Sequence, residues 1–423
     1  MYQSFILLIV VLCFSCPSYA QTADPVDQET VRALVKEVRE LKARVVVLET
    51  KLGQAEERAA ALEPGKPAEP PREPTQPAAG ERESFNVLHG IKIQGFGELS
   101  NRTNDARPPE GASFGFRAGS ASNFAIGDVD LFLTSQITRK AKVLAEVAFS
   151  ETDTQEFETD VERMLLKYDL NDHLKMSFGR FHTATSYYNS IYHHGLWLQT
   201  AADRPLSVEF SDHGGLLPSQ AVGVSLTGSI PSGALGLNYN FEYGSASTIR
   251  PFINAPDAGE VHEHNGNEIT AGLFAKPDWL PGLEIGGSFY HDRLDPENTG
   301  VHIGQSIGSA HVVYATPKFE FINEAFFIQH EVQETGQTFN TPAFYSLISH
   351  KFGDKWRPYF RYQYANASDF SPLFADVGLR HGPSAGIRFD YNDYIAFKAQ
   401  YDHTLRRRLP DIHGLWLQLA FRF

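Results

Sequence analysis

The chain has 423 residues, with 31 Phe and 17 Tyr but only 3 Met, and 12% of its residues are aromatic. Aromatic residues are enriched in strands, so this composition favours β-structure over helical packing. The formal net charge of −14 argues against nucleic acid as a partner, because phosphate groups repel an acidic surface.

An apolar run over residues 5–14 is followed by Ser18-Tyr19-Ala20. The run is too short to cross a bilayer as a helix, and small residues at 18 and 20 suit cleavage by signal peptidase. We therefore predict a signal peptide over residues 1–20, although no Lys or Arg precedes the run. Cys13 and Cys16 both lie in this segment, so the mature chain would contain no cysteine and no disulfide.

Residues 26–62 show a heptad pattern. Apolar residues recur at alternating steps of three and four, at Val31, Leu34, Val38, Leu41, Val45, Leu48, Leu52, Ala55, Ala59 and Leu62. So narrow an apolar stripe buries too little for a lone helix, and it predicts an α-helical coiled coil formed by self-association. Val at a and Leu at d favour two strands, whereas a trimer would need three, and the sequence leaves this open. The alternative is a single amphipathic helix packed on another domain.

The composition changes over residues 63–82, where six prolines alternate with charged and small residues. Such a segment is a semi-extended spacer without a core of its own. It places a domain boundary near residue 83. We expect residues 83–423 to form one folded domain, because all-β barrels often run long as a single unit.

From residue 89 onward, short turns and long loops alternate between segments whose apolar residues follow a period of two. The short turns fall at 139–140, 171–172, 231–232, 277–281, 316–317, 353–354 and 392–393. The longer loops fall at 102–122, 153–160, 183–218, 245–266, 292–304, 332–340, 367–380 and 404–411. These seven turns and eight loops predict sixteen antiparallel strands with both ends on the short-turn side, with fourteen or eighteen as alternatives.

The last predicted strand ends on an aromatic residue, and Leu415, Leu417, Leu419, Phe421 and Phe423 form one apolar face. No segment after the signal peptide is apolar for about twenty residues, so only a closed sheet could cross a membrane here. The predicted fold is an all-β transmembrane β-barrel of sixteen antiparallel strands, preceded by an α-helical coiled-coil arm. The final strand resembles the C-terminal signature of bacterial outer-membrane proteins, which implies recognition of Phe423 by the barrel assembly machinery.

The segment Phe178-Gly179-Arg180-Phe181-His182 resembles the strand end before the third loop of phosphate-selective and related porins. Together with the signal peptide and the arm, this makes nearly the whole chain similar to that class. The resemblance implies a barrel in outer-membrane lipid, an arm in the periplasm and a homo-oligomer, with a trimer favoured. It also implies a third loop that folds inward and narrows the pore. The sequence contains no phosphate-binding motif from which substrate-binding residues could be assigned by this resemblance.

The candidate pore residues lie in the predicted third loop, 183–218, and on the water-facing side of the strands. They are Arg163, Lys167, Lys175, Tyr187, Tyr188, His193, Trp197, Arg204, Glu320, Glu324, Arg357, Arg361, Arg388 and Lys398. Arg361 and Arg388 are expected to form a basic wall, so their replacement by Glu should shift ion preference toward cations. The alternative is that these charges are ordinary lumen residues paired with one another.

Two histidine-containing segments, His193-His194 and His262-Glu263-His264, contain residue types that can bind a metal ion. Adjacent strand residues point to opposite faces, which argues against the first pair, and zinc would be the expected ion at the second. No nucleophile–base arrangement and no phosphate-binding glycine loop occurs in the sequence. We therefore predict no metal site, no cofactor and no enzyme activity.

Three functional hypotheses remain. A passive porin would admit small hydrophilic or charged solutes through a lumen narrowed by the third loop. A substrate-specific receptor of the siderophore or metal type would hold one ligand with its aromatic and histidine-rich loops. A barrel anchor would instead hold a coiled-coil tether in the periplasm. The first is the sequence-based prediction, because no plug domain or energy-coupling segment is present.

Overall fold

The computed structural model describes residues 90–104, 123–151, 157–192, 196–209, 215–247, 267–295, 300–407 and 409–423. The chain divides into two units, Met1–Gly80 and Glu81–Phe423, and all the described residues belong to the second. The predicted signal peptide, coiled coil and Pro-rich linker lie outside the described residues and stay predictions.

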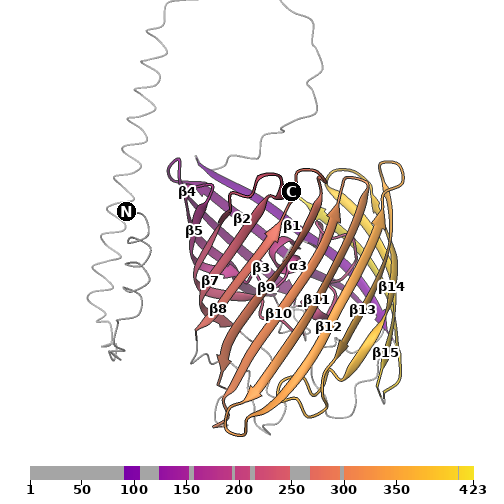
Figure 1. Cartoon of the computed structure of the whole chain (residues 1–423). Helices are drawn as coiled ribbons and strands as arrows, with labels where there is room; N and C mark the ends of the chain where they lie inside the picture. Colours follow the sequence, from indigo (N-terminus) through magenta and orange to yellow (C-terminus); the bar gives the residue numbers. More distant parts are fainter. Residues whose placement is uncertain are drawn as a thin grey trace, which may run out of the picture. The chain divides into compact units, whose positions relative to one another are not determined.

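Sixteen strands close into one antiparallel barrel in which each strand pairs with its sequence neighbours and β1 pairs with β16 (Figure 1). The strands are β1 (Ile91–Asn104), β2 (Asn123–Gln136), β3 (Ala141–Glu151), β4 (Phe157–Asn171), β5 (Leu174–His182), β6 (Gln220–Ser229), β7 (Leu237–Ser247), β8 (Glu268–Ala275), β9 (Leu283–Leu294), β10 (Ile303–Ala315), β11 (Phe319–Val332), β12 (Gln337–His350), β13 (Trp356–Asn366), β14 (Leu379–Asp390), β15 (Ile395–Arg406) and β16 (Ile412–Arg422). Short helices are α3 (Tyr187–Tyr192), η1 (Leu206–Val208) and η2 (Gly233–Leu235). The prediction of a sixteen-stranded closed sheet is confirmed.

All seven predicted short turns separate consecutive strands, and the strand ends fall within a few residues of the expected positions. Two predicted loops, 292–304 and 332–340, are five residues too long, the first because β9 runs to Leu294 and β10 begins at Ile303. β11 runs to Val332 and β12 begins at Gln337, so a four-residue turn joins them. Gly336 adopts a φ of 67° there, a left-handed conformation that glycine takes without steric cost.

The period-two pattern of the sequence sorts side chains between the two faces of the barrel. On β11 the inward positions are buried and comprise Glu320, Ile322, Glu324, Phe326, Ile328 and His330. Between them, Phe327 is 52% exposed on the outer face. Successive residues of a strand point to opposite faces, so a half-polar sequence gives a polar or loop-covered interior and an apolar exterior.

The barrel closes where the C-terminal residues pack on two glycines of β1. Phe423 exchanges backbone hydrogen bonds of 2.9 Å with Gly95 in both directions. A Cβ on Gly95 would lie 2.3 Å from the Phe423 ring, and a Cβ on Gly97 would lie 2.6 Å from the Phe421 ring. The two aromatic rings therefore cover the part of β1 that has no side chains.

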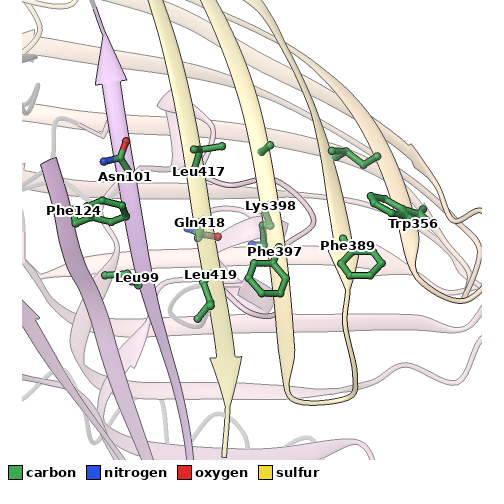
Figure 2. A pocket seen from close by; sticks show the side chains of 12 residues that line it. Leu99, Asn101, Phe124, Trp356, Phe389, Phe397, Lys398, Leu417, Gln418 and Leu419 are labelled. Carbon is green, nitrogen blue, oxygen red and sulfur yellow. The ribbon is translucent and has the colours of Figure 1, made fainter. Parts of the chain in front are cut away.

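The outer face is apolar on both sides of this closure. A groove of about 470 Å³ crosses β1, β2 and β13–β16, and its outward lining includes Leu99, Phe124, Trp356, Phe397 and Leu417 (Figure 2). Exposed apolar surface on this scale marks contact with lipid or with another protein. Among the described residues, no helix is long and apolar enough to cross a membrane.

The interior is filled on one side by loops. The third loop (residues 183–219, hereafter loop 3) and the connection 367–378 between β13 and β14 (loop 7) contribute Tyr188, Val208, Leu217, Leu373 and Phe374 to an internal cluster. This cluster packs against inward-facing residues of β9–β13, such as Ile307, Ile328 and Tyr345. The barrel is therefore asymmetric inside, because these loops cover the wall made by its later strands.

Candidate functional site: loop 3 and the lumen wall

Loop 3 folds into the barrel and lies against its inner wall. Its helix α3 is held at its N-terminal end by Glu324 of β11. The Glu324 carboxylate accepts the backbone N–H of Tyr187 at 2.7 Å and that of Tyr188 at 3.0 Å, and the Tyr345 hydroxyl also donates to it. The first N–H groups of a helix have no partner within the helix, so this carboxylate satisfies two of them.

A second carboxylate, Glu320, lies four residues earlier on the same inward face of β11. It accepts the Tyr192 hydroxyl at 3.1 Å and the Thr200 hydroxyl at 2.6 Å, both from loop 3. Ser349 of β12 donates to the same carboxylate at 3.0 Å, and Arg357 Nη1 lies 3.9 Å from it. Two acidic residues of β11 thus hold α3 and the following residues of loop 3.

Three basic side chains of β13–β15 donate to backbone carbonyls farther along loop 3. Arg361 binds the carbonyl of Asp203 at 2.9 Å and its carboxylate at 2.7 Å. Arg388 binds the carbonyls of residues 197 and 199 at 2.6 and 2.8 Å. Lys398 binds those of residues 196 and 201 at 2.5 and 2.9 Å. Charged donors make the stronger hydrogen bonds in proteins, so this set forms the main attachment of the loop.

These three cations lie beneath loop 3. Arg361 is 0% exposed, Lys398 is 3% exposed and Arg388 is 9% exposed. The structure therefore places the expected basic wall in contact with loop carbonyls, with little of its surface open to solvent. Replacing Arg361 or Arg388 by Glu would consequently release the loop as well as reverse a charge. A shift in ion preference in such a variant would therefore not report on lumen charge alone.

Loop 3 also has an internal packing unit around Tyr188 and Arg204. The Tyr188 hydroxyl donates to Gln199 Oε1 at 2.7 Å, while Arg204 Nε donates to the Val208 carbonyl at 2.8 Å. The Arg204 guanidinium lies 5.2 Å from the centre of the Tyr188 ring. Burial raises the pKa of Tyr188 above its ordinary value and lowers the pKa of Arg204, since it disfavours both charged forms. Tyr188 is therefore a neutral hydroxyl donor at neutral pH.

The exposed charge of the lumen lies on the opposite strands, β3–β5. Lys142 and Lys167 are direct cross-strand neighbours, and the next inward position pairs Asp169 with Lys175. Lys142 and Asp169 have side chains 44% and 41% exposed and lie 3.5 Å apart. Like charges directly opposite on neighbouring strands repel, so this wall gains from an anion beside it. It is a solvent-accessible basic surface of the barrel interior.

The structure brings together most of the residues that the sequence predicted for the pore. Tyr187, Tyr188, Trp197 and Arg204 all belong to the inward-folded loop 3, while Arg163 forms an ion pair with buried Glu146. His193, His194 and the segment 262–264 lie outside the described residues. Within the described residues, no three His, Cys, Asp or Glu side chains converge closely enough to hold a metal ion.

Sequence reasoning found Glu320 and Glu324 but missed one acidic and two neutral partners of loop 3. Gln400 accepts the Ala202 N–H at 3.1 Å, and Gln418 donates to the Ala202 carbonyl at 2.9 Å. Glu242 of β7 accepts the Ala184 N–H at 2.8 Å. Each of these residues occupies an inward-facing strand position, which the alternating pattern could have identified. Nothing in the sequence distinguishes the two glutamines from other uncharged lumen residues.

The fold is that of outer-membrane porins. It is similar to an anion-selective porin from Comamonas acidovorans, with a TM-score of 0.55, 11% identity, and 79% of this chain and 99% of that one covered. It is also similar to the outer membrane channel DcaP of Acinetobacter baumannii, with a TM-score of 0.55, 8% identity, and 80% and 99% covered. OmpF of Salmonella typhi, in a complex with daunomycin, gives a TM-score of 0.52 at 12% identity, with 80% and 99% covered. No family model and no curated protein matches the sequence.

Proposed function

We propose that the protein is a passive outer-membrane porin for small hydrophilic or charged solutes, constricted by loop 3. The attachment of loop 3 along the inner wall carries this proposal. Its contacts reach from Glu242 of β7 to Gln418 of β16, so the loop extends around more than half of the barrel. A loop held this firmly inside a closed barrel restricts the cross-section open to solutes.

The open path follows the strands that loop 3 leaves uncovered. Lys92 and Lys175 are exposed there, Lys142 is half-exposed, and the cations beneath loop 3 are buried. Lumen charges of one sign raise the local concentration of the opposite ion. The porin therefore prefers anions through Lys142, Lys167 and Lys175, which outnumber their neighbour Asp169, a preference also printed in the name of the Comamonas porin.

The surrounding assembly follows from the same proposal. The apolar outer face suits outer-membrane lipid, and the Phe423 side chain, seated on Gly95, is the feature that the barrel assembly machinery would recognise. The coiled coil would lie in the periplasm and hold a homo-oligomer, with a trimer favoured. A closer relation to the phosphate-selective class rests on the sequence resemblance alone.

Reversal potentials across a planar bilayer with a salt gradient test the selectivity. The wild type should show an anion-preferring potential, and Lys142→Glu with Lys175→Glu should move it toward cations. The matched control is Lys276→Glu, which reverses a charge at an exposed side chain near a turn, paired there with Glu284 at 3.0 Å. An unchanged potential in the double variant, or an equal shift in the control, would remove this wall from the mechanism.

A folded protein that forms no channel would contradict the porin proposal itself. In that case the receptor hypothesis would gain, and its test would be saturable retention of a labelled ferric siderophore by the reconstituted protein. The anchor hypothesis would instead be favoured by loss of periplasmic attachment on deletion of residues 26–62.

A further inference from the structure

A row of buried acidic side chains crosses β7–β9 near the start of loop 3. Thr270 of β8 pairs with Glu242 of β7, and the register that pairs Ile269 with His291 places Glu268 beside Asp292 of β9. The row continues through Gln305 of β10 to His330 of β11, which are direct partners in the sheet. Three carboxyl groups therefore occupy neighbouring inward positions.

All three acids of this row are buried, and none has a basic partner in the part of the chain that the structure describes. Glu242, Glu268 and Asp292 are 3%, 0% and 2% exposed. Among the described residues, no Lys or Arg forms an ion pair with any of them, and Glu268 Oε1 has no hydrogen-bond partner. A buried carboxylate without a countercharge is costly, and such a group usually takes up a proton instead.

The groups that face the row are mostly uncharged. Ser225 Oγ donates to Glu242 at 3.3 Å and Thr270 Oγ1 to Glu268 at 2.9 Å. The Asp292 carboxylate accepts the Tyr290 hydroxyl at 2.8 Å and Gln305 Nε2 at 3.3 Å. His330 Nε2 lies 2.8 Å from Gln305 Oε1, so an imidazole ends the row one strand beyond the last acid. Each carboxyl group therefore has one or two uncharged donors, and none of these donors is a cation.

The row also touches both loops that fill the barrel. Glu242 Oε2 accepts the N–H of Ala184, close to the start of loop 3, at 2.8 Å. At the other end, the His330 ring lies 4.7 Å from the ring of Phe374 in loop 7, an edge-on contact. The row therefore contacts loop 3 through Glu242 and loop 7 through His330.

We propose that Glu242, Glu268 and Asp292 form a proton-dependent clamp on the start of loop 3. With protons shared among them, the row carries little charge and loop 3 stays seated. As pH rises, a second carboxylate ionises beside the first, and water must enter to solvate the pair. Loop 3 and Phe374 then move from the wall and the pore widens. Only the conductance consequence rests on the proposed porin function.

The repulsion is large enough to move a loop. Glu268 and Asp292 are directly opposed, with side chains about 5 Å apart, whereas Glu242 lies diagonally from Glu268 at about 7–8 Å. The effective dielectric constant of a protein interior is about 20. Two adjacent carboxylates then repel enough to change the ratio of seated to lifted loop by roughly a hundredfold.

Hydrogen exchange of the full-length protein in detergent or lipid tests the clamp without requiring conduction. Protection of the backbone amides of residues 184–192, corrected for the intrinsic exchange rate, should fall by roughly a hundredfold between about pH 5 and about pH 9. In the variant Glu268→Gln with Asp292→Asn it should stay nearly constant, because the two charges are gone and neither side chain hydrogen-bonds a described residue of loop 3. Heat-modifiable migration checks that both proteins are folded.

Glu331→Gln is the control, since it removes an exposed acid from an outward position of β11, next to inward-facing His330. Its protection should follow the wild-type pH profile. A pH-independent wild type, a pH response kept by the double variant, or a response lost in the control would each overturn the clamp. Because exchange is measured on the folded barrel, these results stand whether or not the protein conducts.

Discussion

Arg361 is the side chain on which the seating of loop 3 depends most clearly. Its guanidinium donates to the Asp203 carbonyl at 2.9 Å, to the Asp203 carboxylate at 2.7 Å and to Ser384 at 3.2 Å. The substitution Arg361→Met keeps an apolar stem of similar length and removes all three bonds. It leaves the Asp203 carboxylate with Gln400 Nε2, at 2.6 Å, as its remaining close donor among the described residues.

Removing one partner of a buried ion pair costs about 3–5 kcal/mol. Since the Asp203 side chain keeps 17% exposure and one donor, we expect a smaller loss, about 2–3 kcal/mol, in the free energy that holds loop 3. This corresponds to roughly 30- to 150-fold faster hydrogen exchange at residues 201–209. Single-channel recordings should show larger and more variable conductance steps.

Lys175→Met is the control for charge, because it removes one exposed lumen cation from β5, which lies away from the loop 3 contacts on β11–β16. Its exchange over residues 201–209 should match the wild type. Equal exchange and equal conductance in Arg361→Met and Lys175→Met would refute the argument that Arg361 holds the loop.

Two further predictions concern glycines that a side chain could not replace. Gly179 has a φ of 124°, and its Cβ would lie 2.0 Å from the Met164 carbonyl, so Gly179→Ala should lower the free energy of unfolding by about 2 kcal/mol or more. Urea unfolding should show a lower midpoint than in Gly308→Ala, where nothing lies within 4 Å of the added carbon. Gly95→Val should displace the Phe423 ring and reduce the heat-modifiable fraction after refolding, whereas an unchanged fraction would argue against that packing.

The order of the strands, and the face of the sheet to which each side chain points, could be predicted from local sequence. This was possible because polar and apolar residues alternate with a period of two along each strand. The inward positions of Glu320, Glu324, Arg361, Arg388 and Lys398 were all available from the alternation. Turn positions were equally local, since Pro, Gly, Asn and Asp end a strand by their own backbone preferences. The loop at 332–340 was predicted too long because its residues are polar. In the structure, most of them belong to paired strands on either side of a short turn at Gly336.

The partners of these inward residues could not be predicted in the same way. Arg361 and Asp203 are 158 positions apart, and they meet only because loop 3 folds across the barrel. The sequence therefore assigned Arg361 to the open lumen, whereas the structure places it beneath loop carbonyls. The burial of Glu268 and Asp292 could likewise not be predicted from the sequence, because it depends on the neighbouring strands and on the loops that cover them.

Single-channel recording of the full-length, folded protein in a planar bilayer tests the central claim most directly. A barrel narrowed by a firmly attached loop predicts discrete conductance steps of constant size, with a reversal potential that favours anions. Heat-modifiable protein that inserts into the bilayer but gives no steps would contradict the account.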